Sequence, residues 1–188
     1  TDLSIVETEI VTDSQGKPVE ENITRIELFR QQSGANDVRL VSRVENGSDV
    51  TGSFLKTFES VRGGILASVS DTGIFDKKLQ DRIRLVSYEV KTGSAIYRFS
   101  LHEQGMIFSG EVKIDMKQGV AVHTKIRAPF MKADDIAISN YEETVLYRLE
   151  EGCWYPYEIN ETMGIKTNGF FNSFTGHVKT ETIIARNN

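Results

Sequence analysis

Three histidines are the residues of this chain best suited to acid–base chemistry or metal binding: His102, His123 and His177. Each lies on the polar side of a segment in which apolar and polar residues alternate, as in a β-strand with one side in solvent. They are far apart in sequence and form neither a His-x-His nor a His-x-x-x-His pair, the spacings that begin many metal sites. We therefore expect solvated strand histidines.

Adjacent carboxylates are the second candidates for acid–base chemistry. The chain has four such pairs: Glu20-Glu21, Asp134-Asp135, Glu142-Glu143 and Glu150-Glu151. Neighbours on a strand point to opposite faces, so these pairs cannot easily share a proton or a metal ion. Asp134-Asp135 is placed in a predicted connection after Pro129, where a surface loop is the expected role. With no Gly-x-Ser-x-Gly motif and no phosphate-binding loop, we predict no catalytic residue, no metal site and no cofactor.

Aromatic residues gather late in the chain and are the candidates for contact with an apolar ligand. They are Trp154, Tyr155, Tyr157, Phe170, Phe171 and Phe174. The more common role of such a cluster is to close the end of a sheet as core. The alternative is that Trp154 and Phe170 line a pocket, because large rigid aromatic side chains suit apolar ligands.

The elements that position these residues are mostly strands. In the clearest run, Tyr97, Phe99 and Leu101 alternate with polar residues, and similar runs between turns extend from Leu85 to Ile184 and from Leu3 to Val44. Strands of about a dozen residues without long crossovers predict an antiparallel meander of about ten strands. So wide a sheet twists and coils. The predicted fold is one mainly β domain over residues 1–188, a curled half-barrel or open barrel with one or two short helices over its concave face.

One stretch departs from the alternation. Val50, Phe54, Phe58 and Val61 are spaced as on one face of a helix, with Ser48 or Asp49 as its cap and Gly63-Gly64 as its end. Ile65 to Ser70 is predicted to be a strand, and Asp76 to Arg84 either one or two helical turns or an extended edge. A helix across the hollow of the sheet would place Phe54 and Phe58 against a ligand or a core.

Composition excludes several classes of function. The chain has 188 residues, 39% of them apolar, and a net charge of −5, which argues against a nucleic-acid partner. No apolar run is long enough to span a bilayer, and the single cysteine, Cys153, excludes an internal disulfide. The first residue is Thr1, as expected of an exported protein whose signal peptide has been removed.

Two segments resemble a known family. Gly110 to Asp115 followed by Gly119, and Gly152 to Ile159 after Tyr147-Arg148, are similar to hairpins of the periplasmic lipoprotein-carrier superfamily typified by LolA and LolB. The resemblance covers residues 85–185. It implies an unclosed antiparallel barrel, lidded by helices, that binds acyl chains without catalysis. The N-terminal helix of the carriers is not evident, and their cavity arginine matches no single position here, so no binding residue is transferred.

The sequence is compatible with three functions. The first is a non-enzymatic, exported bacterial protein that binds a lipid, an acyl chain or a lipoprotein in a hydrophobic cavity lined by Phe54, Phe58, Trp154 and Phe170. The second is an envelope or surface interaction module with a filled core, which binds a protein partner through aromatic residues or strand edges. The third is an enzyme on a calycin-like barrel that uses His123 or Asp134.

Overall fold

The computed structural model describes residues 2–31, 33, 35–69, 73–75, 77–103, 106–133, 136–150, 152–167 and 173–185. Within these residues, eleven strands form one antiparallel sheet. The strands are β1 (Asp2–Thr12), β2 (Pro18–Arg30), β3 (Asn36–Glu45), β4 (Ser48–Asp49), β5 (Ile83–Lys91), β6 (Ser94–Glu103), β7 (Met106–Asp115), β8 (Val120–Ala133), β9 (Ile136–Glu150), β10 (Cys153–Thr167) and β11 (Ser173–Ala185).

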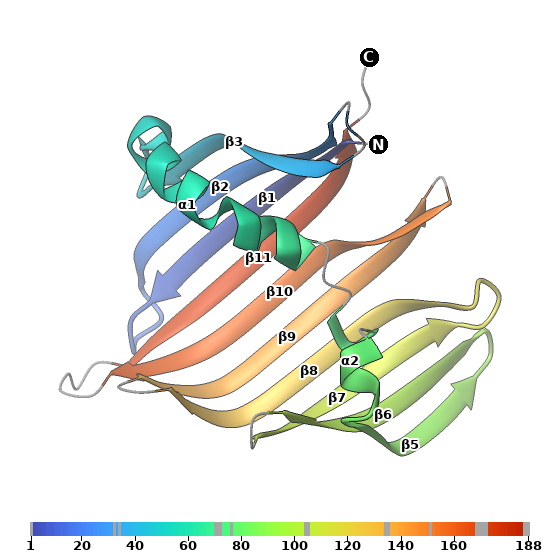
Figure 1. The fold of residues 1–188 in the computed structure, drawn as a ribbon. Coiled ribbons are helices and arrows are strands. Elements are labelled where there is room, and N and C mark those ends of the chain that lie inside the picture. The colour runs from blue at the N-terminus through green and yellow to red at the C-terminus, as the bar shows by residue number, and fades with distance from the viewer. Residues whose placement is uncertain are drawn as a thin grey trace.

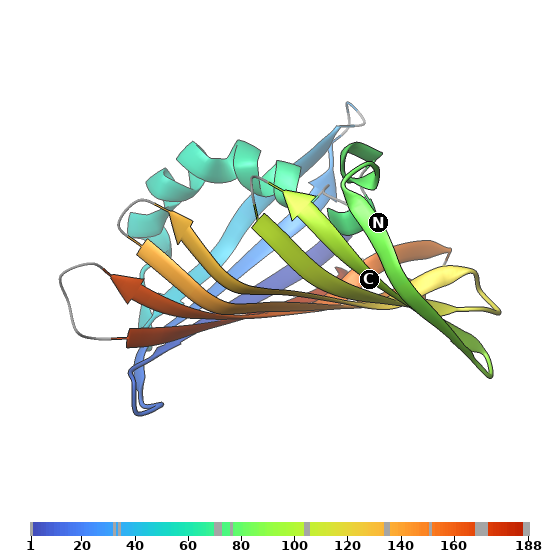
Figure 2. The ribbon, with the colours of Figure 1, turned by 90° about the horizontal axis from the view of Figure 1, so that it is seen from below.

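The sheet is curled and does not close, which confirms the predicted fold class. Its order is β4-β3-β2-β1-β11-β10-β9-β8-β7-β6-β5 (Figure 1). The first and last strands are therefore neighbours, and the two described ends of the chain, Asp2 and Ala185, are direct partners. The two edges, β4 and β5, are joined by the helical segment of the chain. Seen from below, the sheet is a trough with the helices on its concave side (Figure 2).

The helical segment consists of α1 (Thr51–Val69), a 3-10 turn η1 (Gly73–Phe75) and α2 (Lys77–Gln80). The predicted helix is confirmed, but its predicted end at Gly63-Gly64 and the strand from Ile65 are wrong, because α1 continues to Val69. Both glycines keep helical backbone with open space around them, at a cost of about 1 kcal/mol each. The helix face that meets the sheet therefore continues to Ile65, which lines the space between α1 and the sheet. Val61, which was predicted to lie on the same face, is exposed.

A second correction concerns Pro129, which was predicted to end a strand. β8 instead runs through it to Ala133, paired with β9, which begins at Ile136. The ladder between β7 and β8 stops at the pair Ser109–Arg127. Beyond that point, the described residues give β8 a single strand partner, β9. A proline that lacks an N–H is tolerated at such an edge. Asp134-Asp135 lies outside the described residues.

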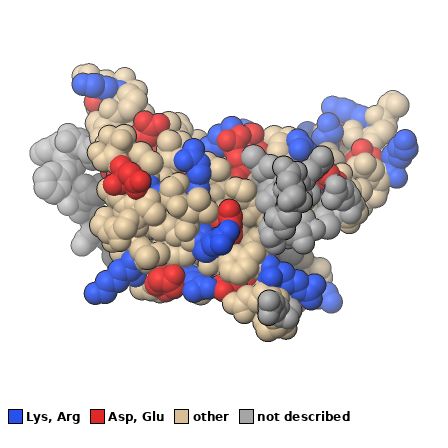
Figure 3. Space-filling model, turned by 90° about the horizontal axis from the view of Figure 1, so that it is seen from above, with Lys and Arg blue, Asp and Glu red and all other residues tan. Residues whose placement is uncertain are grey.

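A compact apolar cluster holds the β5–β8 part of the sheet against η1. Its buried members are Ile74, Phe99, Leu101, Val112 and Ala121. The alternation predicted for Phe99 and Leu101 is confirmed, since both side chains are 5% exposed. Elsewhere on the concave face burial is mixed: Ile5 and Val145 are buried, whereas Ile26 and Leu28 are half-buried. Seen from above, the molecular surface carries charges of both signs, interspersed (Figure 3).

Candidate ligand-binding cavity on the concave face

A cavity of about 660 Å³ lies between α1 and the floor of the trough. Most of its walls are apolar or threonine side chains from α1, η1 and six strands. They include Leu3, Ile5, Thr24, Ile26, Leu28, Phe54, Phe58, Ile65, Ile74, Thr124, Ile126, Val145, Pro156, Ile159, Thr180 and Thr182. Ligand pockets in proteins span about 300–1,000 Å³ and are mostly apolar, with a few placed polar groups. This cavity has the size and chemistry of such a pocket.

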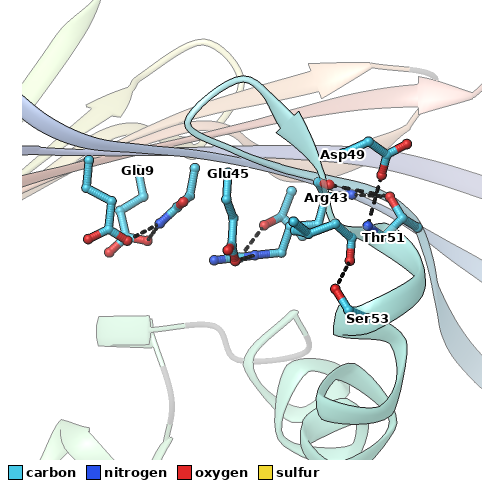
Figure 4. A network of polar contacts seen from close by, with 10 residues as sticks. Glu9, Arg43, Glu45, Asp49, Thr51 and Ser53 are labelled. Atoms are coloured by element: carbon cyan, nitrogen blue, oxygen red, sulfur yellow. Dashed lines mark hydrogen bonds and ion pairs between the residues drawn. The ribbon is translucent and has the colours of Figure 1, made fainter.

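The beginning of α1 is attached to β3 around Arg43. The Val50 N–H donates to the Arg43 carbonyl at 2.9 Å, and the Arg43 N–H donates to Thr51 Oγ1 at 2.8 Å. Asp49 accepts the Thr51 N–H at 2.9 Å, as expected of a residue that caps a helix (Figure 4). The Arg43 guanidinium lies 4.3 Å from the centre of the Phe54 ring, a cation–π contact. These contacts hold Phe54 over the cavity.

The middle of α1 is attached to the same strand by an ion pair. Arg62 Nε donates to Asp37 Oδ1 at 2.9 Å, and its Nη2 donates to Oδ2 of the same carboxylate. Gln31 also donates to Asp37, at 2.5 Å. Hydrogen bonds from Arg62 lower the pKa of the Asp37 carboxyl. Between the two attachments lies Phe58, which is 1% exposed. The position of α1 above the trough is thus set by β3.

Aromatic rings form the other end of the cavity. Tyr147 and Trp154 stack with centroids 4.5 Å apart and planes 8° apart, and the ring of Phe75 meets Trp154 edge-on at 5.5 Å. Trp154 Nε1 donates to the carbonyl of Ala121 at 2.7 Å, which satisfies the indole N–H. The indole is therefore held rigidly, with its apolar surface toward the cavity.

Four charged side chains also line the cavity: Glu7, Arg43, Glu143 and Glu161. Burial, together with the nearby Glu7, raises the pKa of Glu161. Glu7 is partly buried and remains open to solvent. Its partial burial and the charge of Glu9 raise its pKa, whereas the charge of Arg43 lowers it. The pKa of Tyr141 is raised by burial and by Glu143 and Glu161. Its neutral hydroxyl donates to Glu143 at 3.4 Å.

A second hollow of about 250 Å³ lies between η1 and strands β5 to β7. It is lined by Ile74, Phe75, Ile83, Leu85, Tyr97, Phe99, Val112 and Ile114. Ile74 lines both hollows, so the 3-10 turn is the partition between them.

Three of the four aromatic residues proposed from sequence line the large cavity: Phe54, Phe58 and Trp154. Phe170 lies outside the described residues. Whether the three touch a ligand stays a prediction. His102 and His177 are exposed. His123 is half-buried, and burial lowers its pKa, but it lines neither hollow.

Sequence reasoning missed the charged lining. Leu3, Ile5, Glu7 and Glu9 share one face of β1, so the alternation itself places carboxylates on the apolar side. The period-two pattern of β1 is the sequence signal that marks these carboxylates. Among the described residues, no cluster of three His, Cys, Asp or Glu side chains is arranged to hold a metal ion. No helix in the described part is long and apolar enough to cross a membrane.

Comparisons with known proteins add little. No family model matches the chain, and no curated protein matches it. The resemblance to the LolA and LolB superfamily therefore stays a prediction. One solved structure, a "putative outer membrane protein" from Bacteroides fragilis NCTC 9343, aligns over 95% of this chain and 96% of its own, with 8% identity and a TM-score of 0.15. A score that low does not establish a shared fold.

Proposed function

We propose that this protein is a non-enzymatic, exported carrier or receptor that binds a lipid, an acyl chain or a lipidated partner in the concave cavity. The observation that carries the proposal is the cavity itself, about 660 Å³ of mostly apolar space held open between α1 and the sheet. Two separate attachments to β3 hold the helix over this space, so the site is preformed. A preformed site saves a ligand the cost of ordering the protein around it.

The energetics of the walls favour an aliphatic ligand. Each methylene buried from water contributes about 0.8 kcal/mol, or about a fourfold gain in affinity. The stacked rings of Tyr147 and Trp154 offer a flat apolar wall, and leucine and isoleucine side chains from β1 and β2 offer the floor. An acyl chain can use both surfaces because it is flexible and has no polar groups to satisfy.

Two measurements on the purified protein test this function. Native mass spectrometry and solvent extraction should show co-purifying lipid. A fluorescent alkyl probe with a neutral head group should bind, and unlabelled alkyl chains should displace it about fourfold more strongly per added methylene until the cavity is filled. Absence of co-purifying lipid together with absence of probe binding would refute the proposal.

A matched pair of variants assigns binding to the cavity. Ile26→Trp fills space on the concave face, whereas Arg25→Trp adds the same side chain to the opposite, exposed face of β2. We expect Ile26→Trp to weaken probe binding at least about tenfold and Arg25→Trp to leave it unchanged. Equal effects of the two variants would place the probe elsewhere. Export is tested separately, by fractionating cells that express the native gene.

A second candidate, binding of a protein partner, is favoured by the edge strand β5. Leu85, Val86, Tyr88 and Val90 are each more than 60% exposed, and a bulge leaves Val86 without a partner in β6. Unpaired, apolar edge strands are templates for an added strand. If the protein lacks lipid, fails to bind the probe, and associates through an interface that Val86→Lys disrupts, this candidate replaces the first.

A further inference from the structure

The pairing register places hydrogen-bond acceptors from five strands of the concave face in one row, which crosses a sixth strand, β11, at Val178. From β3 across the sheet to β9, each residue of the row is the direct cross-strand partner of the next one. In order, the residues are Glu45, Asn22, Glu9, Val178, Glu161 and Glu143. Directly paired residues share one face of a sheet, and Glu143 and Glu161 line the cavity. We call Glu9, Asn22, Glu45, Glu143 and Glu161 the acidic row.

Near the acidic row, the described lining of the cavity carries more carboxylates than cations. Arg43 is the one cationic side chain among the described residues that line the cavity, and it is already engaged. Its Nε donates to Glu45 at 2.7 Å, and its Nη1 donates to Thr24 at 2.8 Å. Figure 4 shows Glu9, Arg43 and Glu45 on the side of the sheet that faces α1. Glu143 and Glu161 are direct cross-strand partners of like charge, an arrangement that destabilises a sheet.

An independent feature of the row is a buried acceptor without a donor. Asn22 is 4% exposed, and its Nδ2 donates to Glu9 at 3.1 Å and to Glu20 at 2.7 Å. Its Oδ1 is buried and accepts no hydrogen bond from the described residues. A buried acceptor left unpaired costs about 1–3 kcal/mol, so its retention needs an explanation. A ligand that brings hydrogen-bond donors to the row supplies one.

Polarity changes steadily along the strands away from this row. On the concave face of β1, the residue next to Glu9 is Glu7, whose cross-strand partners are Thr24 and Thr180. The following residues on that face are Ile5 and Leu3, whose partners in β2 are Ile26 and Leu28. Glu7, Ile5, Leu3 and these partners all line the cavity. One end of the trough is therefore acidic, and the other end is aliphatic.

From this arrangement we propose that the ligand is an amphiphile with a cationic head group, an ammonium or a guanidinium, whose head contacts the acidic row and whose chain lies over the aliphatic end. The inference rests on the proposed function and narrows its ligand. Ammonium and guanidinium groups carry only donors, which match a row that carries carboxylates and an amide oxygen. Charge-assisted hydrogen bonds of this kind are about twice as strong as neutral ones. A fatty-acid carboxylate, by contrast, would meet like charge.

The test compares three ligands that share one chain: dodecylammonium, dodecanol and dodecanoate. For each ligand, displacement of the fluorescent probe is measured on three proteins. These are the wild type, the double variant Glu143→Gln/Glu161→Gln, and the control variant Glu181→Gln. Glu181 is the control because it is an exposed carboxylate of β11 on the opposite face from Thr180 and Thr182. Spermidine, which has the charge but no chain, is the fourth competitor.

We expect dodecylammonium to bind the wild-type protein at least about tenfold more tightly than dodecanol or dodecanoate. The double variant should lose that preference while still binding dodecanol, and Glu181→Gln should keep it. If dodecanol or dodecanoate binds as tightly as dodecylammonium, the cationic head is refuted but the lipid cavity stands. If spermidine competes as well as dodecylammonium, the amphiphile is refuted. If none of the alkyl ligands binds, both proposals fail.

Discussion

Replacing Gly110 with alanine tests the packing that supports the η1 partition. Gly110 on β7 is directly opposite Phe99 on β6, and the Phe99 ring lies over it. A Cβ added at Gly110 would lie 2.1 Å from Cζ and 2.5 Å and 2.7 Å from the two Cε atoms of that ring. The ring is 5% exposed and belongs to the buried cluster with Ile74 and Leu101, so it can yield only toward the second hollow, and it loses packing in that cluster when it does.

Two opposing terms set the magnitude. Gly110 does not have a positive φ, so alanine is compatible with its backbone and gains about 0.4–1 kcal/mol from a less flexible unfolded chain. Overpacking a buried cluster costs about 1–3 kcal/mol, and contacts of 2.1–2.7 Å call for the upper part of that range. The net expectation is a loss of about 2 kcal/mol. For a chain of this size that is a fall in Tm of about 4–8 °C.

Chemical denaturation and thermal melts of four proteins measure the effect: wild type, Gly110→Ala, Phe99→Leu and the double variant. Because the leucine lacks the ring, Gly110→Ala should be neutral or stabilising in the Phe99→Leu background. Gly63→Ala in α1 is the control, since nothing lies within 4 Å of its added Cβ and alanine should stabilise the helix by about 1 kcal/mol. If Gly110→Ala is as stable as wild type, or equally destabilising without the Phe99 ring, the packing argument is wrong.

Two further predictions concern charge. Glu161→Gln should stabilise the protein at pH 7 by a few tenths of a kcal/mol, the scale of unfavourable charge contacts in a sheet, because burial and the nearby Glu7 raise the pKa of Glu161 above its ordinary 4.5 in the folded state. The unfolded chain ionises first as pH rises, so the gain should appear above pH 4.5 and vanish below it, and a gain independent of pH would contradict this. Arg62→Met should loosen α1, seen as faster amide hydrogen exchange around Phe58, and should lower stability at neutral pH. Arg62 lowers the pKa of Asp37 below its ordinary 3.8, so the loss of stability in the variant should shrink as pH falls through the folded-state pKa of Asp37. Unchanged hydrogen exchange around Phe58 would show that the Arg62–Asp37 ion pair does not hold α1 on β3.

The strands could be predicted from sequence because each depends on local information. The alternation of Tyr97, Phe99 and Leu101 requires only that one face be apolar, and the Asn46-Gly47 turn requires only residues that accept positive φ, which both adopt. The errors arose where tertiary contacts override local preference. Gly63-Gly64 is a natural helix end, yet α1 continues because Ile65 beyond it reaches the cavity. Pro129 is a natural strand end, yet β8 passes through it at a point where the described residues give the strand a partner on one side only.

The sequence by itself determined a curled antiparallel sheet with a helix above it, because the period of apolar residues dictates which face each element buries. It also singled out Phe54, Phe58 and Trp154 as large apolar side chains. The tertiary structure alone decided that these three surround one cavity and that Glu9, Glu161 and Glu143 line up in one row. The physical reason is register: residues far apart in the chain become neighbours only through the pairing of β1 with β11 and of β11 with β10, and no local pattern encodes that pairing.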